Sequence, residues 1–416
     1  MVLLTLAQFV FLTSQKTATL SKRVVKRKDT QKPKYGHSMI TSRLLGPTAT
    51  GVPSHLNLPK PCAIYSIVNW MVAHPNVRGI QTMCIKSLPS LLEDEQQRII
   101  GRRVGLVEVI LCAMMRFSES IELHIAAFHA IVLLARPLGG REGMLFDNSM
   151  AETTNSIGLT SLIELSDSVS LAARCGGLPR ILSKTSSGTT ASDDSSTNVT
   201  NENRKTGISI LVDSMKRFSS SEKLQSTACW ALVNVALVPL QKNMLMKIGG
   251  IEGILSTMEN HSTSFDVQFR ALFALINLSV PCRQTDFVLD PGIDAAEATH
   301  IETVVLKKLG ARIAKLSVSA MNNFSSNEAI LNRGCLVVHN LSQSPEFIPA
   351  LLTTPKCYEI LEFCLTNHSA DRVLRRSVRS TLQRIKFYLD QHPEARRRLQ
   401  TYLEQQQNRD AVEQVY

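Results

Sequence analysis

Apolar residues recur along the chain in blocks that share one spacing. Counted from Met258, apolar or small residues stand 9, 13, 16, 17 and 20 positions later. The same frame begins, without gaps, at five other anchor residues: Met71, Met114, Met215, Met321 and Leu365. These spacings put the apolar side chains on one stripe of an α-helix, whereas a half-buried strand would alternate. The pattern therefore predicts six copies of one long helix and no sheet.

The limits of the helices are also indicated. Ser219 with Glu222, and Ser325 with Glu328, match the capping box that begins a helix. Glycines upstream of the anchors predict a break before a shorter helix, at Gly105, Gly207, Gly250 and Gly310. Each unit is expected to contain a short helix ending at the anchor, a tight corner and a long helix. Units of about 43 residues made only of helices are typical of an α-solenoid, here with about six to seven repeats.

The distances between anchors predict where the repeats are interrupted. Successive anchors lie 43, 101, 43, 63 and 44 residues apart. The step of 101 contains a Ser/Thr-rich segment, about 183–205, that we expect to be a disordered insert. The step of 63 predicts a loop at about 281–300, and whether 145–182 is a degraded extra repeat stays open. We predict three regions: an N-terminal arm over 1–60, a solenoid over 61–392 and a helical tail over 393–416.

Two segments, CWALVNVA (Cys229–Ala236) and FALINLS (Phe273–Ser279), resemble the armadillo-repeat family, which includes importin-α and β-catenin. The resemblance extends over about Ala63–Gln391. It implies an all-α, right-handed superhelix in which the third helix of each repeat lines a concave groove. In that family an Asn on the third helix holds the backbone of an extended peptide.

The matching position here, 19 residues after the anchor, is Asn in three consecutive repeats: Asn234, Asn277 and Asn340. A carboxamide donates and accepts hydrogen bonds at once, so a ladder of them suits a peptide main chain. The same side chain can instead bond the backbone of the neighbouring repeat. Both interpretations stay open, since one residue can do both.

Other groove candidates come from the same alignment. Importin-α-like proteins place Trp four residues before the Asn, and only Trp230 matches; Phe273 and Leu336 occupy that position in the next two repeats. Arg270 and Arg333, 12 residues after their anchors, would repel a basic cargo. We therefore predict a scaffold or adaptor whose groove binds an extended peptide or a partner helix, of acidic or mixed character. The alternative is an importin-α-like transport receptor for basic localisation signals.

The positive charge belongs to the front of the chain. The chain carries +11 overall, and residues 1–92 hold 12 Lys or Arg against a single acid, Asp29. A basic run lies in the N-terminal arm: Lys22, Arg23, Lys26, Arg27 and Lys28. It is compatible with a nuclear localisation signal, a tether for polyanions, an autoinhibitory arm or a passive tail. No aromatic residues are interleaved with these cations, so specific recognition of nucleic acid is not expected.

Nothing in the sequence indicates catalysis. There is no Gly-rich phosphate loop, no nucleophile elbow and no His pair at metal-ligand spacing, because His124 and His129 do not share a helix face. We expect no enzyme, metal, cofactor or small-molecule substrate, and partners that are other proteins. The nine cysteines include no Cys-x-x-Cys pair, which favours buried thiols in the cytoplasm or nucleus. Val2–Leu12 has the length of a signal-peptide core without its flanking features, and no run is long enough to span a membrane.

Overall fold

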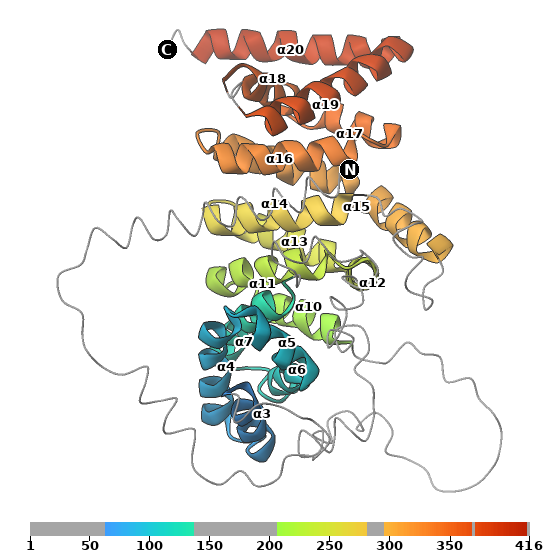
Figure 1. The fold of residues 1–416 in the computed structure, drawn as a ribbon. Helices are drawn as coiled ribbons and strands as arrows, with labels where there is room; N and C mark the ends of the chain where they lie inside the picture. The colour runs from blue at the N-terminus through green and yellow to red at the C-terminus, as the bar shows by residue number, and fades with distance from the viewer. Residues whose placement is uncertain (1–62, 137–205, 281–294, 368–370, 414–416) are drawn as a thin grey trace, which may run out of the picture. The chain divides into compact units, whose positions relative to one another are not determined.

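Every regular element in the described part of the chain is helical. The computed structural model describes residues 63–136, 206–280, 295–367 and 371–413, which form 16 α-helices and one short 3-10 helix (Figure 1). The chain divides into two units, Met1–Leu58 and Pro59–Tyr416, and the described residues all lie in the second. The predicted all-α solenoid is confirmed.

Each repeat ends in a long helix, which we call the third helix. The described third helices are α4 (Arg78–Leu92), α7 (Ile121–Leu134), α11 (Glu222–Val235), α14 (Phe265–Ser279), α16 (Glu328–Leu341) and α19 (Arg372–Gln391). Each packs on the next in that order. Figure 1 shows this succession from the blue α4 to the red α19.

The remaining helices complete the repeats. Second helices, which end at or near the anchors, are α3 (Ala63–Ala73), α6 (Leu106–Arg116), α10 (Gly207–Arg217), α13 (Gly250–Asn260), α15 (Ala295–Asn323) and α18 (Cys357–Asn367). Short first helices precede three of them: α5 (Glu95–Arg103), α12 (Pro239–Lys247) and α17 (Ile348–Thr353), the last preceded by η6 (Pro345–Phe347). α20 (Pro393–Glu413) follows the last third helix.

The predicted apolar stripe is the core. In α11 the five stripe positions, Leu224, Ala228, Ala231, Leu232 and Val235, each have 0% exposure. The five equivalent positions of α14 are also fully buried, and so are the anchor methionines near the ends of the second helices. Burial of apolar surface contributes about 25 cal/mol per Å². A repeat that buries one stripe against its neighbours therefore depends on those neighbours for its stability.

The predicted capping boxes are wrong by two residues. α11 begins after Ser221, whose hydroxyl accepts from the Leu224 N–H at 3.4 Å, and α16 begins after Asn327, which caps Ala329 and Ile330. The corner before each helix is a tight turn closed by a backbone bond from residue i+3 to residue i, which consumes the residues expected to cap. The helices therefore start later than the pattern of Ser and Glu indicates.

The glycine breaks are right in part. Gly105 and Gly249 take left-handed φ values of 78° and 83° before α6 and α13, the second one residue earlier than expected. The break at Gly310 is wrong, because α15 runs through it. A Cβ atom at Gly310 would lie 2.7 Å from the Phe347 ring, so the glycine permits close approach of η6.

The two long steps between anchors add no repeat to the described stack. α7 packs directly on α11 although residues 137–205 separate them in sequence, and the possible extra repeat at 145–182 lies outside the described residues. The expected loop at 281–300 is shorter at its end, because α15 already begins at Ala295. The predicted arm over 1–60, the Ser/Thr-rich insert and residues 281–294 of the loop lie outside the described residues.

Candidate functional site

The third helices present one common face. Positions 8, 12, 15, 19 and 22 after each anchor are spaced by four and three residues, so they share a stripe beside the buried one. We call these positions the ladder face. Most of the predicted groove residues occupy it in the central helices α11, α14 and α16.

The third helices share a register because polar groups fix where each one begins. The side chains of Ser221, Ser264, Asn327 and Asp371 accept hydrogen bonds from the first-turn amides of α11, α14, α16 and α19. Such caps contribute about 1 kcal/mol each and stop the helix from starting elsewhere. The same positions therefore face the same way in successive repeats.

A buried polar clamp, which the sequence analysis missed, fixes the corner of the repeat. The amide nitrogen of Gln225 donates to Met215 O at 2.7 Å and to Phe218 O at 2.9 Å. Gln268 makes the equivalent pair with Met258 O and His261 O, and so does Gln81 in the first repeat. The signal was present in the sequence, since position 10 after the anchor is Gln in three repeats, beside an apolar stripe.

In the second described repeat, His124 replaces the clamp glutamine. Its Nε2 lies 3.1 Å from Met114 O, and its Nδ1 lies 2.7 Å from the Ser214 hydroxyl of α10. The backbone carbonyl requires a donor, so the imidazole is neutral with its proton on Nε2, and Ser214 donates to Nδ1. Desolvation by burial lowers the pKa of His124 to about 4. The histidine is a structural link between repeats rather than a catalytic base.

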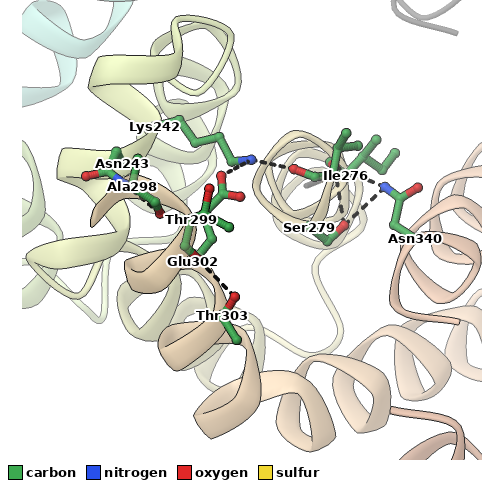
Figure 2. A network of polar contacts seen from close by, with 10 residues as sticks. Lys242, Asn243, Ile276, Ser279, Ala298, Thr299, Glu302, Thr303 and Asn340 are labelled. Carbon is green, nitrogen blue, oxygen red and sulfur yellow. Dashed lines mark hydrogen bonds and ion pairs between the residues drawn. The ribbon is translucent and has the colours of Figure 1, made fainter. Parts of the chain in front are cut away.

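The three predicted asparagines bond the preceding repeat. Nδ2 of Asn234 donates to Val132 O at 2.8 Å, that of Asn277 to Val233 O at 2.9 Å, and that of Asn340 to Ile276 O at 3.1 Å. Figure 2 shows Asn340 reaching Ile276 and Ser279 of α14. All three side chains are half-buried.

These bonds keep one register over very different sequence distances. Donor and acceptor are 102, 44 and 64 residues apart, yet each Asn meets the carbonyl 18 positions after the preceding anchor. The inserted residues therefore do not change how the third helices stack. At Asn234 and Asn277 the bond uses one amide hydrogen, and no described residue bonds Oδ1. Asn340 also donates to Ser279 Oγ, and its Oδ1 accepts from Gln343 Nε2 at 3.4 Å.

The aromatic and cationic candidates form one cluster. The Arg270 guanidinium lies 5.4 Å from the centroid of the Trp230 ring, and its Nη1 donates to the Ser226 hydroxyl at 2.8 Å. The Trp230 and Phe273 rings meet edge to face, with centroids 6.0 Å apart. The indole face that would accept a cation from a ligand is therefore beside a cation of the chain itself.

Arg333 and Leu336 lie deeper than the sequence analysis expected. The Arg333 guanidinium lies 3.7 Å from the Phe269 ring centroid and 4.8 Å from that of Phe273, and the residue is only 5% exposed. Burial lowers its pKa to about 10, which leaves it charged at neutral pH. Leu336 is 9% exposed. Both support the ladder face from beneath, while Trp230, Arg270 and the asparagines remain partly exposed.

Several large apolar side chains are exposed on the same face. Those at ladder positions, on or next to a third helix, are Met83 at 53%, Leu237 at 37%, Val373 at 39% and Phe387 at 65%. They lie on α4, just after α11 and on α19, and scattered exposed apolar residues of this kind are common on protein surfaces. The ladder face thus combines apolar groups with oriented carboxamides.

A buried ion pair joins α12, the end of α14 and α15. Lys242 of α12 meets Glu302 of α15 at 2.7 Å, with side-chain exposures of 4% and 6%, and the ammonium also bonds Val280 O at the end of α14. Figure 2 shows this network together with Asn243, which donates to Ala298 O at 3.2 Å. These contacts hold the start of α15 against α12 and α14.

Metal and membrane chemistry find no support in the described residues. Among them, no group of three or more His, Cys, Asp or Glu side chains could hold a metal ion. None of the helices in the described ranges is both long and apolar enough to cross a membrane. The basic run Lys22–Lys28 lies outside the described residues.

A match to one family model agrees with the repeat architecture. A family model described as LRRK2 ARM repeat matches residues 185–354. The crystal structure of an engineered protein from a structural genomics consortium aligns with 79% of this chain and 98% of its own, at 15% identity and a TM-score of 0.48. A comparison with curated proteins found no match.

Proposed function

We propose that the ladder face of this solenoid binds an extended segment of a partner protein, and the match of residues 185–354 to a family model of ARM repeats supports this. Repeats of this kind are in general scaffolds for protein interaction, because they offer one long surface and no enclosed catalytic site. The proposed role is that of an adaptor in the cytoplasm or the nucleus.

The observation that carries the proposal is the common orientation of three carboxamides. The bonds from Asn234, Asn277 and Asn340 to the preceding helices hold each amide plane in place. At Asn234 and Asn277 an oxygen and a second hydrogen remain for a ligand, whereas Asn340 also contacts Ser279 and Gln343. Helices pack about 8–10 Å apart, which is the length of about three residues of extended chain. One carboxamide per repeat would therefore meet the peptide backbone at regular intervals.

Arg270 favours an acidic or mixed segment over a basic one. Its guanidinium stacks beside Trp230, where a lysine of a basic signal would otherwise be received. The Arg270 guanidinium would repel a ligand lysine placed beside the same ring. An importin-α-like receptor for basic signals is the alternative function, and it requires Arg270 to move aside.

The test uses Trp230 as the reporter. The chain has two tryptophans, so Trp70→Phe leaves Trp230 alone on the ladder face. This protein is titrated with three 12-residue peptides that share their apolar residues and differ in carrying Glu, Gln or Lys. We expect the Glu peptide to bind most tightly, and Asn277→Ala to weaken it at least tenfold.

Asn322→Ala is the matched control. Asn322 is half-buried and its Nδ2 also donates to a backbone carbonyl, Val318 O at 2.9 Å, but within α15 rather than across the ladder. Equal loss in both variants would contradict the proposal. Tightest binding of the Lys peptide would instead support the transport receptor.

A further inference from the structure

The last helices enclose a cleft that is separate from the ladder face. Its volume is about 610 Å³, and its walls come from α18, α19 and α20, the elements at the C-terminal end in Figure 1. The α19 wall is formed by Leu382, Ile385 and Leu389, and the α20 wall by Leu399 and Leu403. Cavities of this size accommodate ligands or several side chains of a partner.

The cleft exists because α20 covers the end of the solenoid incompletely. Over its first three turns α20 offers few apolar side chains, and two of them, Leu399 and Leu403, remain half-buried. Its other visible attachments are Tyr402, whose hydroxyl accepts from the Lys356 N–H at 3.1 Å, and an ion pair of Arg396 with Asp390. On the α19 wall Ile385 and Leu389 are buried, at 2% and 9% exposure, and Leu382 is half-buried.

The rim of the cleft carries more positive than negative charge, with Arg379, Lys386 and Arg396 against Glu404. α19 holds six Lys or Arg against a single acid, Asp390, which is already paired with Arg396. Arg379 and Lys386 line the cleft, are exposed, and make no ion pair or hydrogen bond with the described residues. Such a rim attracts an acidic partner and rejects a basic one.

The shape fits a helix. The lining residues run from Arg379 to Leu389 on α19 and from Arg396 to Glu404 on α20, about 15 Å and 12 Å at 1.5 Å per residue. The apolar positions of α19 fall at i, i+3 and i+7, and the two cations lie seven residues apart. A partner helix of two to three turns could contact the apolar positions with leucines and pair with the two cations through carboxylates on its flanks.

We propose that this leucine cleft binds an amphipathic helix with acidic flanks from a partner protein. The site does not depend on the proposed function of the ladder face. Leu382 and Leu389 lie on nearly the opposite side of α19 from its ladder positions Ser380 and Phe387, so the two surfaces can be occupied or lost independently.

The test uses the full chain and two fluorescein-labelled 18-residue model helices. Both carry leucines at i, i+3, i+7, i+10 and i+14, one flanked by Glu and the other by Lys. Anisotropy titrations should show saturable binding of the Glu helix only. Arg379→Glu with Lys386→Glu should weaken it at least tenfold, and Leu403→Ser at least threefold.

Arg372→Glu with Arg376→Glu is the matched control, since both are exposed cations of α19 that do not line the cleft. We expect less than a threefold effect from that pair. Equal weakening by the two charge reversals, or no effect of Leu403→Ser, would overturn the proposal. So would binding of the Lys helix with the same affinity, or displacement of the Glu helix by oleate at a lower concentration than unlabelled peptide.

Discussion

The buried ion pair between Lys242 and Glu302 makes a quantitative prediction about stability. Both side chains are nearly inaccessible, their charged atoms are 2.7 Å apart, and Lys242 also caps the carboxyl end of α14 through Val280 O. Removing one partner leaves a buried, unpaired charge, which costs about 3–5 kcal/mol, whereas replacing both by apolar residues of similar volume is often neutral.

The perturbation is therefore a cycle of three variants. We expect Lys242→Met and Glu302→Leu each to lower the free energy of unfolding by about 3–5 kcal/mol, and the double variant to recover most of that loss. Urea denaturation followed by circular dichroism measures all three. Additive losses in the double variant, or single losses below about 1 kcal/mol, would refute the view that these two charges compensate each other.

Three further predictions follow from buried polar and close contacts. The pKa of His124 falls from 6.5 to about 4 on folding, so the unfolded chain binds the proton more tightly than the folded chain. The free energy of unfolding should therefore decrease by up to about 3 kcal/mol as the pH falls from 6.5 to 4. His124→Gln should reduce this pH dependence in denaturation experiments across the same range. Gln268→Leu leaves Met258 O and His261 O without their donor and should cost about 1–3 kcal/mol by urea denaturation, whereas retention of full stability would argue against the clamp. Gly310→Ala should lower Tm because its Cβ meets the Phe347 ring, and Phe347→Leu should restore part of the loss in the same melting experiment.

The fold could be predicted because the same spacing of apolar residues recurs from repeat to repeat. The stripe that includes Leu224 and Leu232 recurs without gaps, and a helical period with that spacing leaves one face that must be buried. The exact starts were not predictable, because both Ser219 and Ser221 can cap a helix. The turn closed by the hydrogen bond from Ser221 N–H to Phe218 O makes Ser221, and not Ser219, the first residue before α11.

The candidate site was predictable in position but not in its bonding. Asn234 could be assigned to the ladder from its place in the repeat, but its acceptor, Val132 O, is 102 residues away. The pairing of Lys242 with Glu302 likewise crosses an irregular step between repeats, so no local spacing reveals it. Arg333 was assigned to the groove from its place 12 residues after the anchor, whereas in the structure it is buried against two aromatic rings.

Mapping where a bound peptide lies would test the central claim most directly. The Glu peptide, carrying a photoreactive benzophenone residue, is cross-linked to the full chain, and the products are identified by mass spectrometry. We predict cross-links to α11, α14 and α16 at exposed residues of the ladder face or its edge, such as Lys223, Asp266 and Gln343. Cross-links confined to the second helices α13 and α15, or the absence of saturable binding, would contradict the account.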